Sequence, residues 1–308
     1  MPFFSVIIPL YNKEKFIENT LKSILCQSFI DFEVIIVNDG STDGSEKKVF
    51  DFKDDRIRYY YKENEGVSIA RNYGIQKAKS DYITFIDADD YWYPNFLQIM
   101  HQTIQRYPLQ KVFSAAIEIE TFNKIIKATY SIPKTNDYEI VNFFDASQKE
   151  AIIWTSSSVF SATVFLEVGH FDEKLSISED TDLWIRIGLR YDVVFIWKIL
   201  ARYGYDQNSI SRNLNYFLQE RSYLKHINEE KTNLSLKKYL DLNRFSEAIK
   251  HKVSHNEEKF KSTKANIDLD LLVLRKRLLL FLPSIFLKHL IQIKNFLASI
   301  GLGNSVFK

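Results

Sequence analysis

The sequence predicts an α/β protein with a mostly parallel sheet, helices flanking that sheet, and a helical C-terminal extension. Short apolar runs alternate with helix-like stretches through the first third of the chain, as in successive βαβ units. The apolar runs are continuous rather than alternating, which is typical of strands buried on both faces. The runs cover Ser5–Ile8, Val34–Val37, Ile57–Tyr61 and Tyr82–Ile86, and the helix-like stretches cover Lys13–Gln27, Gly44–Phe52 and Val67–Lys79.

Beyond Pro94 the elements are less evenly spaced. A helix is expected to reach about Tyr107, and Glu179–Tyr191 is predicted to be another. Strands are predicted at Lys111–Ile119, Lys124–Tyr130 and Val193–Tyr203, and Trp154–Phe165 is expected to pass from strand to helix. From about Asn213 the pattern is helical to the end of the chain. We therefore expect one domain over residues 1–212 and a helical region over residues 213–308.

Composition limits the class of protein. Of the 308 residues, 45% are hydrophobic and 26% are charged, as in a globular chain with a core. A net charge of +2 gives no reason to expect a nucleic-acid partner. Cys26 is the only cysteine, and the apolar N-terminal run lacks the basic segment and cleavage site of a signal peptide. We therefore expect a cytoplasmic protein without a transmembrane helix.

Candidate binding residues follow the first two strands, because parallel sheets bind ligands beyond the C-terminal ends of their strands. Pro9, Tyr11 and Asn12 follow the first strand, although Asn12 is also suited to cap the next helix. Asp39 follows the second strand, in N-D-G-S-T-D, and either accepts hydrogen bonds from a nucleobase or belongs to an ordinary turn. The first loop has neither G-x-G-x-x-G nor G-x-x-x-x-G-K-[ST], so a dinucleotide fold and a P-loop are not supported.

Three carboxylates crowd the end of the fourth apolar run, in F-I-D-A-D-D. Without a counter-charge, Asp87, Asp89 and Asp90 would repel one another and raise their own pKa values. Hard oxygen ligands suit Mg²⁺ or Mn²⁺, and the D-x-D spacing lets the carboxylates reach one metal ion and a ribose. The alternative is a solvated acidic turn that caps the next helix.

Two helices carry further candidates. Arg71, in S-I-A-R-N-Y-G, lies where an anion would meet both its guanidinium and the helix dipole, unless this is only a surface helix. Glu179 and Asp180, in S-E-D-T-D-L-W, are either favourable first-turn acids behind an N-cap at Ser178 or a general base near the metal site. Trp184 is either a platform for an acceptor or, as an aromatic residue on a helix, part of the core.

In their order and spacing, the motifs S-V-I-I-P-L-Y-N, V-N-D-G-S-T-D, S-I-A-R-N-Y-G, F-I-D-A-D-D and S-E-D-T-D-L-W resemble those of family 2 of the glycosyltransferases. The resemblance covers about Phe4–Ser211. It implies the GT-A fold and an inverting, metal-dependent transfer of a sugar from a nucleotide diphosphate to a hydroxyl group of a glycan or lipid-linked saccharide.

The resemblance also implies a role for each matching residue. Asp180 would be the catalytic base, and Glu179 would help to position the acceptor, with Trp184 beside it. Asp89, together with Asp87, would bind the Mn²⁺ or Mg²⁺ that bridges the diphosphate. The nucleotide site would comprise Pro9, Tyr11, Asn12, Asp39, Arg71, Asp87 and Ala88. In that site Asp39 would contact the base, most often uracil in this family, and Arg71 would lie near the phosphates.

One segment departs from the family pattern. Many relatives carry a histidine in a Y-R-x-H-x-x-S-like segment after the last strand, where this chain has Asp206. A carboxylate there could still face a metal ion, but with the opposite charge preference.

The C-terminal segment Leu269–Leu297 is apolar but interrupted by Arg275, Lys276, Arg277, Lys288 and Lys294. Pro283 is expected to break or kink it. The segment is predicted either to pack against the first domain or a second subunit, as in a homo-oligomer, or to lie in a membrane surface with its basic side chains snorkelling outward. Membrane binding, at the inner face of the cell membrane, would suit an acceptor linked to polyprenyl diphosphate.

Two other functions stay open on the sequence. A non-catalytic nucleotide-sugar-binding scaffold would keep the fold, but it would be free to lose Asp87, Asp89 and Asp180. A sugar nucleotidyltransferase would usually carry a glycine-rich basic loop after the first strand, which Leu10–Phe16 lacks.

Overall fold

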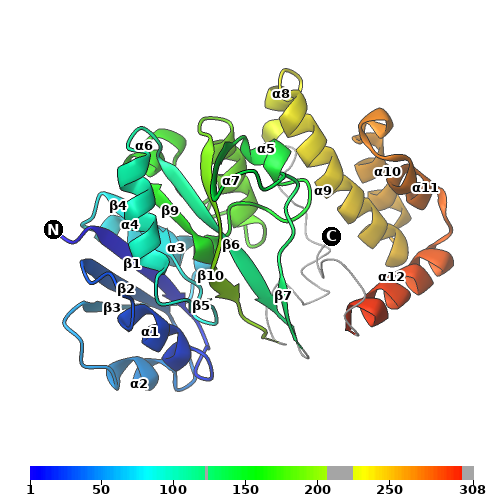
Figure 1. Ribbon diagram of the computed structural model, residues 1–308. Coiled ribbons are helices and arrows are strands. Elements are labelled where there is room, and N and C mark those ends of the chain that lie inside the picture. Colours follow the sequence, from blue (N-terminus) through cyan, green and yellow to red (C-terminus); the bar gives the residue numbers. More distant parts are fainter. Residues whose placement is uncertain (122–123, 207–224, 300–308) are drawn as a thin grey trace. The chain divides into compact units, whose positions relative to one another are not determined.

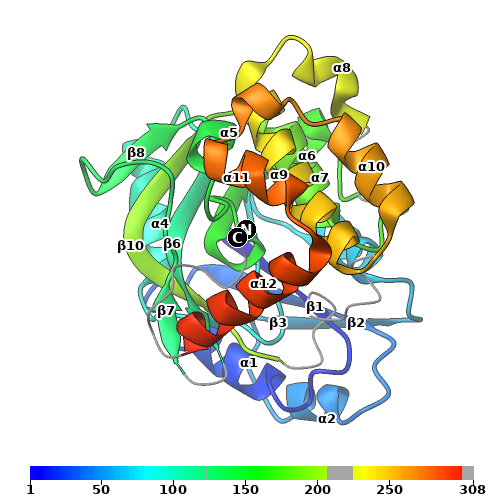
Figure 2. The ribbon, with the colours of Figure 1, turned by 90° about the vertical axis from the view of Figure 1, so that its right-hand side faces the viewer.

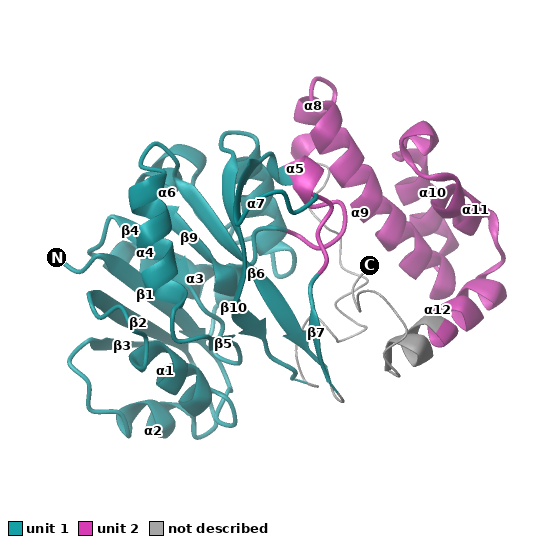
Figure 3. Ribbon diagram, in the orientation of Figure 1, with its two compact units in different colours: residues 1–128, 133–143, 152–207 teal, residues 129–132, 144–151, 208–308 magenta. Residues whose placement is uncertain are grey.

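The computed structural model describes residues 1–121, 124–206 and 225–299, which fall into two compact units (Figure 3). Unit 1 comprises residues 1–128, 133–143 and 152–207, and unit 2 comprises residues 129–132, 144–151 and 208–308. The domain boundary expected near residue 213 lies outside the described residues.

The N-terminal part of unit 1 alternates strands and helices, as the sequence predicts (Figure 1). These elements are β1 (Phe4–Leu10), α1 (Ile17–Leu25), β2 (Phe32–Asp39), α2 (Ser45–Phe50), β3 (Ile57–Lys62), α3 (Val67–Lys77) and β4 (Tyr82–Phe85). The later elements of the chain are β5 (Tyr91–Trp92), α4 (Phe96–Arg106), β6 (Val112–Glu120), β7 (Ile125–Lys127), β8 (Tyr138–Val141), α5 (Phe143–Ala146), η1 (Thr155–Ser157), β9 (Ser158–Ser161), α6 (Ala162–Val168), α7 (Glu179–Gly188) and β10 (Val193–Tyr203). All of these belong to unit 1 except α5, which lies mostly in unit 2.

In the described part of the chain, ten strands form one sheet in the order β3-β2-β1-β4-β9-β6-β10-β5, with β7 paired to β6 and β8 to β10. Strands β1 to β4 are parallel. Because β9 is antiparallel to both β4 and β6, strand β6 and its parallel neighbour β10 run in the same direction as β1 to β4. The predicted mostly parallel sheet is therefore confirmed, with short antiparallel strands added to it.

Helices cover both faces of this sheet. Successive residues of each strand point to opposite faces, so each face has its own side chains to pack against a helix. Phe4, Val6 and Ile8 of β1 belong to the core cluster that includes residues of α1 and α4. Ile7, between them, faces α3, where a Cβ on Gly74 would lie only 2.3 Å from its Cγ2 atom. Glycine at this position therefore lets α3 approach the strand closely.

Aromatic side chains join α6 and α7 to the same face as α3. Phe85 of β4 contacts Phe160 of β9 and Phe165 of α6, with ring centroids 6.3 and 6.0 Å apart. Trp184 of α7 stacks on Phe160 at 5.2 Å. These contacts fix the start of α7 relative to the end of β4.

Unit 2 is helical in its described C-terminal part (Figure 2). Its elements there are α8 (Ile227–Glu230), α9 (Leu234–Val253), α10 (Glu257–Ala265), η5 (Leu269–Leu271), α11 (Leu274–Phe281) and α12 (Ser284–Ser299). A small core joins α9, α10, η5 and α11, with Phe245, Phe260 and Leu280 among its members. The predicted break at Pro283 is confirmed, since it separates α11 from α12. None of the described helices has both the length and the apolar character that crossing a membrane requires.

Candidate functional site

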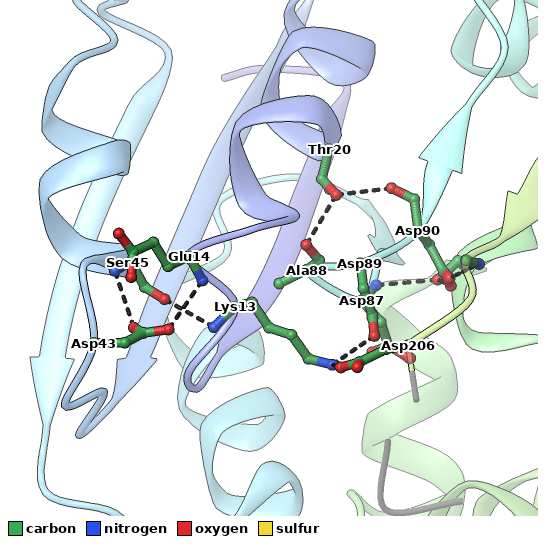
Figure 4. Close-up of polar contacts among 12 residues, drawn as sticks. Lys13, Glu14, Thr20, Asp43, Ser45, Asp87, Ala88, Asp89, Asp90 and Asp206 are labelled. Carbon is green, nitrogen blue, oxygen red and sulfur yellow. Dashed lines mark hydrogen bonds and ion pairs between the residues drawn. The ribbon is translucent and has the colours of Figure 1, made fainter. Parts of the chain in front are cut away.

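The loops after β1 and β2 are tied together by side-chain hydrogen bonds (Figure 4). The amide of Lys13 donates to Ser45 Oγ at 2.8 Å, and the amide of Glu14 donates to Asp43 Oδ2 at 3.0 Å. Asn12, which adopts a left-handed conformation with φ of 51°, accepts a hydrogen bond from the amide of Thr42 through Oδ1. Asn12 therefore connects two loops rather than capping α1, whose N-cap position is Phe16.

A second set of hydrogen bonds holds the acidic turn after β4. Thr20 of α1 donates its hydroxyl group to the carbonyl oxygens of Ala88 and Asp90, at 3.0 and 2.8 Å (Figure 4). Ser156 accepts from the amide of Asp87 and donates to the Asp90 carboxylate. Asp90 also accepts from the amide of Gly204, just after β10, at 2.8 Å. The turn is thus held from three sides, which leaves Asp87 and Asp89 to face the site.

A carboxylate of the turn after β4 and a carboxylate just after β10 meet at a lysine. Lys13 Nζ lies 2.6 Å from Asp89 Oδ2 and 2.6 Å from Asp206 Oδ2 (Figure 4). All three side chains are largely buried, with exposed fractions of 20%, 15% and 11%. Residues from the loop after β1, the turn after β4 and the end of β10 therefore form one charged cluster.

Burial perturbs the carboxyl groups of the turn. It raises the pKa of Asp89, and the charges of Asp87 and Asp206 act in the same direction, whereas Lys13 opposes them. Burial also raises the pKa of Asp90 well above its ordinary value, with the neighbouring charges of Asp89 and Asp87 adding to the effect. The mutual repulsion predicted from the sequence is therefore present in the structure.

Arg71 connects the acidic turn to α7. Its Nη2 atom lies 2.8 Å from Asp87 Oδ1, and its Nη1 atom lies 2.9 Å from Glu179 Oε1. The guanidinium is buried and lies over the ring of Phe171, 5.2 Å from the centroid. The pKa of Arg71 is raised, because Asp87 and Glu179 outweigh the opposing effect of its burial. In this structure Arg71 therefore bridges two carboxylates at the site, and contact with phosphate is an untested prediction.

Glu179 and Asp180 open α7 beside this bridge. Burial, and then the charge of Asp180, raise the pKa of Glu179 to about 7. Asp180 is half-buried, and its Oδ1 accepts from the amide of Thr181. Ser178 stands at the N-cap position as predicted, but it has a left-handed φ of 59° and its side chain makes no capping hydrogen bond. A non-glycine residue in this conformation is costly, and such residues are concentrated at functional sites.

Asp39, predicted to contact a base, is held by the loop after β3. Its Oδ1 accepts from Lys62 Nζ at 2.6 Å and from the amide of Glu65, and its Oδ2 accepts from the amide of Gly66. The side chain is only 4% exposed. A base would therefore have to replace Lys62 or share the carboxylate with it.

The other residues predicted to bind nucleotide or acceptor differ in their exposure to solvent. Tyr11 is 46% exposed, whereas Ala88 and Pro9 are buried. Trp184 is 3% exposed and packs in the core through its contact with Phe160. An acceptor platform must be accessible, so the core interpretation of Trp184 replaces the acceptor role.

An open cavity of about 400 Å³ adjoins the acidic turn. Its lining includes Lys15 just before α1, Asn19 of α1, Asp89, and Arg202 with Tyr205 near the end of β10. This space gives solvent and small polar molecules access to the Asp89 side of the cluster.

Lys13 and Ser156 were missed at the sequence level, and Asp206 was noted without a firm role. Lys13 stands in a basic, helix-like stretch, and nothing near it in the sequence indicates a contact with residues 89 and 206. Ser156 belongs to the serine-rich segment before β9, which predicts a strand but not its contact with Asp87. A residue that completes a cluster through tertiary contacts has no local pattern by which it could be found.

The oxygen donors of the cluster fit a hard divalent cation. Mg²⁺ is usually bound by one or two carboxylates together with substrate phosphates rather than by a cage made only of protein ligands. Asp89 and Asp206 provide two carboxylates that converge on one cationic point, and Asp87 lies on the same turn. Among the described residues, no group of three or more His, Cys, Asp or Glu side chains is arranged to hold a metal ion.

Comparison with known proteins identifies the family. The model of glycosyl transferase family 2 matches residues 5–169, which is more than half of the chain, so the chain belongs to this family. An uncharacterized glycosyltransferase of Rickettsia felis is 31% identical over 224 residues, covering 71% of this chain, and one of Rickettsia bellii is 29% identical over 248 residues, covering 74%. The chain spans only about a third of the length of these two relatives (35% and 34%).

Solved structures of TarS from S. aureus share the fold. The TarS 1–349 complex with UDP-GlcNAc has a TM-score of 0.60 at 16% identity, covering 85% of this chain and 90% of that one. The complex with UDP has a TM-score of 0.57 at 19% identity, covering 87% and 88%. The GT-A fold expected from the sequence is thereby confirmed.

Proposed function

We propose that this protein transfers a sugar from a nucleoside diphosphate, in particular UDP, to a hydroxyl group of a glycan or lipid-linked saccharide, with inversion and with the help of Mn²⁺ or Mg²⁺. The observation that carries the proposal is the bridge by Arg71, which joins Asp87 of the acidic turn to Glu179, next to Asp180. Membership of glycosyl transferase family 2 supports the reaction class. The solved complexes of TarS with UDP-GlcNAc and with UDP support a uridine nucleotide as donor.

The chemistry requires one proton acceptor and a site for the leaving group. The Asp180 carboxylate takes the proton of the acceptor hydroxyl as that oxygen bonds to the anomeric carbon. The bond from the anomeric carbon to the diphosphate oxygen breaks on the opposite face, so a single displacement inverts the anomeric centre. Glu179, held by Arg71, positions the start of α7 and hence Asp180.

The leaving diphosphate carries developing negative charge. A divalent cation bound by Asp89 and Asp206 would stabilise that charge as a Lewis acid. The tied loops after β1 and β2 would enclose the nucleotide, with Tyr11, Asn12 and Asp39 on its base side. Arg71 holds Asp87 in position through an ion pair.

A membrane surface is proposed as the location of the acceptor. The outward residues of α11 include Leu274, Leu278 and Phe281, with exposed fractions of 69%, 58% and 62%. Between Leu271 and Ser299 the sequence has no acidic residue. An exposed apolar surface accompanied by basic residues fits an anionic lipid surface, where a polyprenyl-linked saccharide would be found.

The test of the proposed function separates binding from transfer. Calorimetry with UDP, GDP and CDP, with and without Mn²⁺, should show metal-dependent binding of UDP that Asp89→Ala abolishes. Turnover of a UDP-sugar should fall by orders of magnitude in Asp180→Asn while UDP binding persists. Asp192→Asn is the matched control, because the exposed Asp192 lies just before β10, at the opposite end of that strand from the site.

The outcomes discriminate among the candidate functions. Full turnover in Asp180→Asn would remove the base assignment. UDP binding without turnover in the wild type would favour the scaffold, and pyrophosphate release from a nucleoside triphosphate and a sugar phosphate would favour the nucleotidyltransferase. No nucleotide binding under any metal condition would overturn the proposal.

A further inference from the structure

Lys13 occupies the point at which a divalent cation would be bound. Its ammonium group lies 2.6 Å from one oxygen of Asp89 and 2.6 Å from one oxygen of Asp206. Metal–oxygen distances for Mg²⁺ are about 2.0–2.1 Å, so a metal ion bound to the same two oxygens would overlap the ammonium nitrogen. The two cations therefore exclude each other sterically.

The charges lead to the same conclusion. With Lys13 in place, one positive charge faces two carboxylates. A divalent cation would balance both carboxylates by itself, and the ammonium would then be a like charge at contact distance. Arg71 cannot take the place of Lys13, because it is engaged by Asp87 and Glu179.

Because the main chain of Lys13 is held separately, its side chain can move away from the two carboxylates without unfolding the loop. Its main-chain amide is held by Ser45 Oγ at 2.8 Å, independently of the ammonium group. A lysine side chain is a point charge on a flexible four-carbon stem. The stem can therefore swing outward while the loops after β1 and β2 stay tied together.

We propose that Lys13 and a divalent metal ion are alternative counter-ions of Asp89 and Asp206, so that Lys13 holds the two carboxylates together before the metal binds and sets the metal affinity. The inference deepens the proposed function and rests on its metal dependence. Lys13 is a positioning residue in this scheme, and each metal ion that binds displaces one ammonium group.

Metal binding without nucleotide tests the proposal directly. The electron paramagnetic resonance signal of free Mn²⁺ would be titrated with full-length wild type, Lys13→Met and Lys13→Gln at constant pH and ionic strength. Loss of the competing charge should tighten Mn²⁺ binding by about tenfold, as expected for removing a partly buried ion-pair competitor worth about 1.4 kcal/mol. Combining Lys13→Met with Asp206→Asn should weaken binding again.

A nearby lysine provides the matched control. Lys15 is exposed, lines the adjoining cavity and makes no ion pair with any residue that the structure describes. Lys15→Met removes the same charge two residues away and should change Mn²⁺ affinity no more than about twofold, as expected for a screened charge. An equal gain in Lys15→Met would show a general charge effect and overturn the proposal.

Other outcomes are equally decisive. Mn²⁺ binding in both Lys13 variants that is no tighter than in wild type, or no binding in any of the proteins, overturns the inference. Tryptophan fluorescence of each variant verifies the fold of unit 1, which contains all four tryptophans. Calorimetry with UDP on the same samples tests the proposed function separately. Tight Mn²⁺ binding without UDP binding would reject the proposed UDP-sugar donor but would leave the competition between Lys13 and the metal ion intact.

Discussion

At the scale of single residues, Glu179 is a group whose ionisation the fold perturbs strongly. Burial and Asp180 raise its pKa from 4.5 to about 7, so between these values the folded protein binds more protons than the unfolded chain. The stabilising contribution is therefore complete below about pH 4.5 and is lost as the pH rises to about 7.

Glu179→Gln should remove this pH dependence while keeping an acceptor for Arg71. The decrease in unfolding free energy from pH 5 to pH 8 should be larger in wild type than in the variant by up to about 3 kcal/mol, because one pKa unit corresponds to about 1.4 kcal/mol. Urea denaturation followed by tryptophan fluorescence measures this difference for unit 1. Parallel pH profiles of the two proteins would contradict the raised pKa.

Individual residues also show which parts of the site could be predicted from the sequence. The acidic turn was found because three carboxylates at the end of an apolar strand are unfavourable without a partner. The partner, Lys13, could not be found, since it stands 76 residues before Asp89 and contacts it only through the fold. The burial of Trp184, in contrast, could be predicted locally. An aromatic residue on a helix is expected to pack in the core, and Trp184 is buried in the structure.

At the scale of secondary-structure elements, the junction between β10 and the acidic turn is the tightest contact of the site. A Cβ on Gly204 would lie 1.9 Å from the carbonyl oxygen of Asp89, which is backbone and cannot rotate away. The amide of Gly204 also donates to Asp90 at 2.8 Å. Glycine therefore lets the chain leaving β10 touch the turn and bring Asp206 to Asp89.

Gly204→Ala should force the turn and the end of β10 apart. We expect a loss of about 1–3 kcal/mol in unfolding free energy, as for an overpacked site, together with a loss of metal-dependent UDP binding. Gly169→Ala is the control, because it strains a φ of 82° but brings its Cβ no closer than 3.5 Å to any neighbour outside the adjacent residues. The control should lose stability and retain UDP binding, and unchanged UDP binding in Gly204→Ala would contradict the role of this contact.

The elements that the sequence predicted are those with a local pattern. Strands β1, β2 and β4 are largely apolar and alternate with helices, and the structure has β1 to β4 within a few residues of the expected bounds. Strand β3, which contains Arg58 and ends in Lys62, is only partly buried, so the expected burial on both faces is wrong for this strand. Strands β5 and β8 were missed because one has two residues and the other is only partly buried. Both exist through pairing with β10, which is a tertiary contact rather than a local preference.

At the scale of the whole molecule, the question is whether the surface of α11 and α12 binds lipid. Ile285 and Phe286 on α12 are 60% and 58% exposed, which adds to the apolar surface of α11. An apolar side chain that leaves water contributes about 1.5–3 kcal/mol, and each basic residue near an anionic surface about 1 kcal/mol. A few such side chains suffice for reversible membrane binding.

Wild type should sediment with vesicles containing phosphatidylglycerol at moderate salt, and less with neutral vesicles, because the basic residues of the segment favour anionic lipid. Leu278→Gln combined with Phe281→Gln should abolish sedimentation, since both side chains are more than half exposed and neither belongs to the core of unit 2. The matched control is Leu109→Gln with Leu166→Gln, which removes two apolar residues of unit 1 that are 90% and 82% exposed. If wild type stays in solution, or if the α11 variant and the control sediment alike, the proposal that this surface binds lipid fails. Concentration-dependent association of wild type alone would then favour a second copy of the chain on this surface.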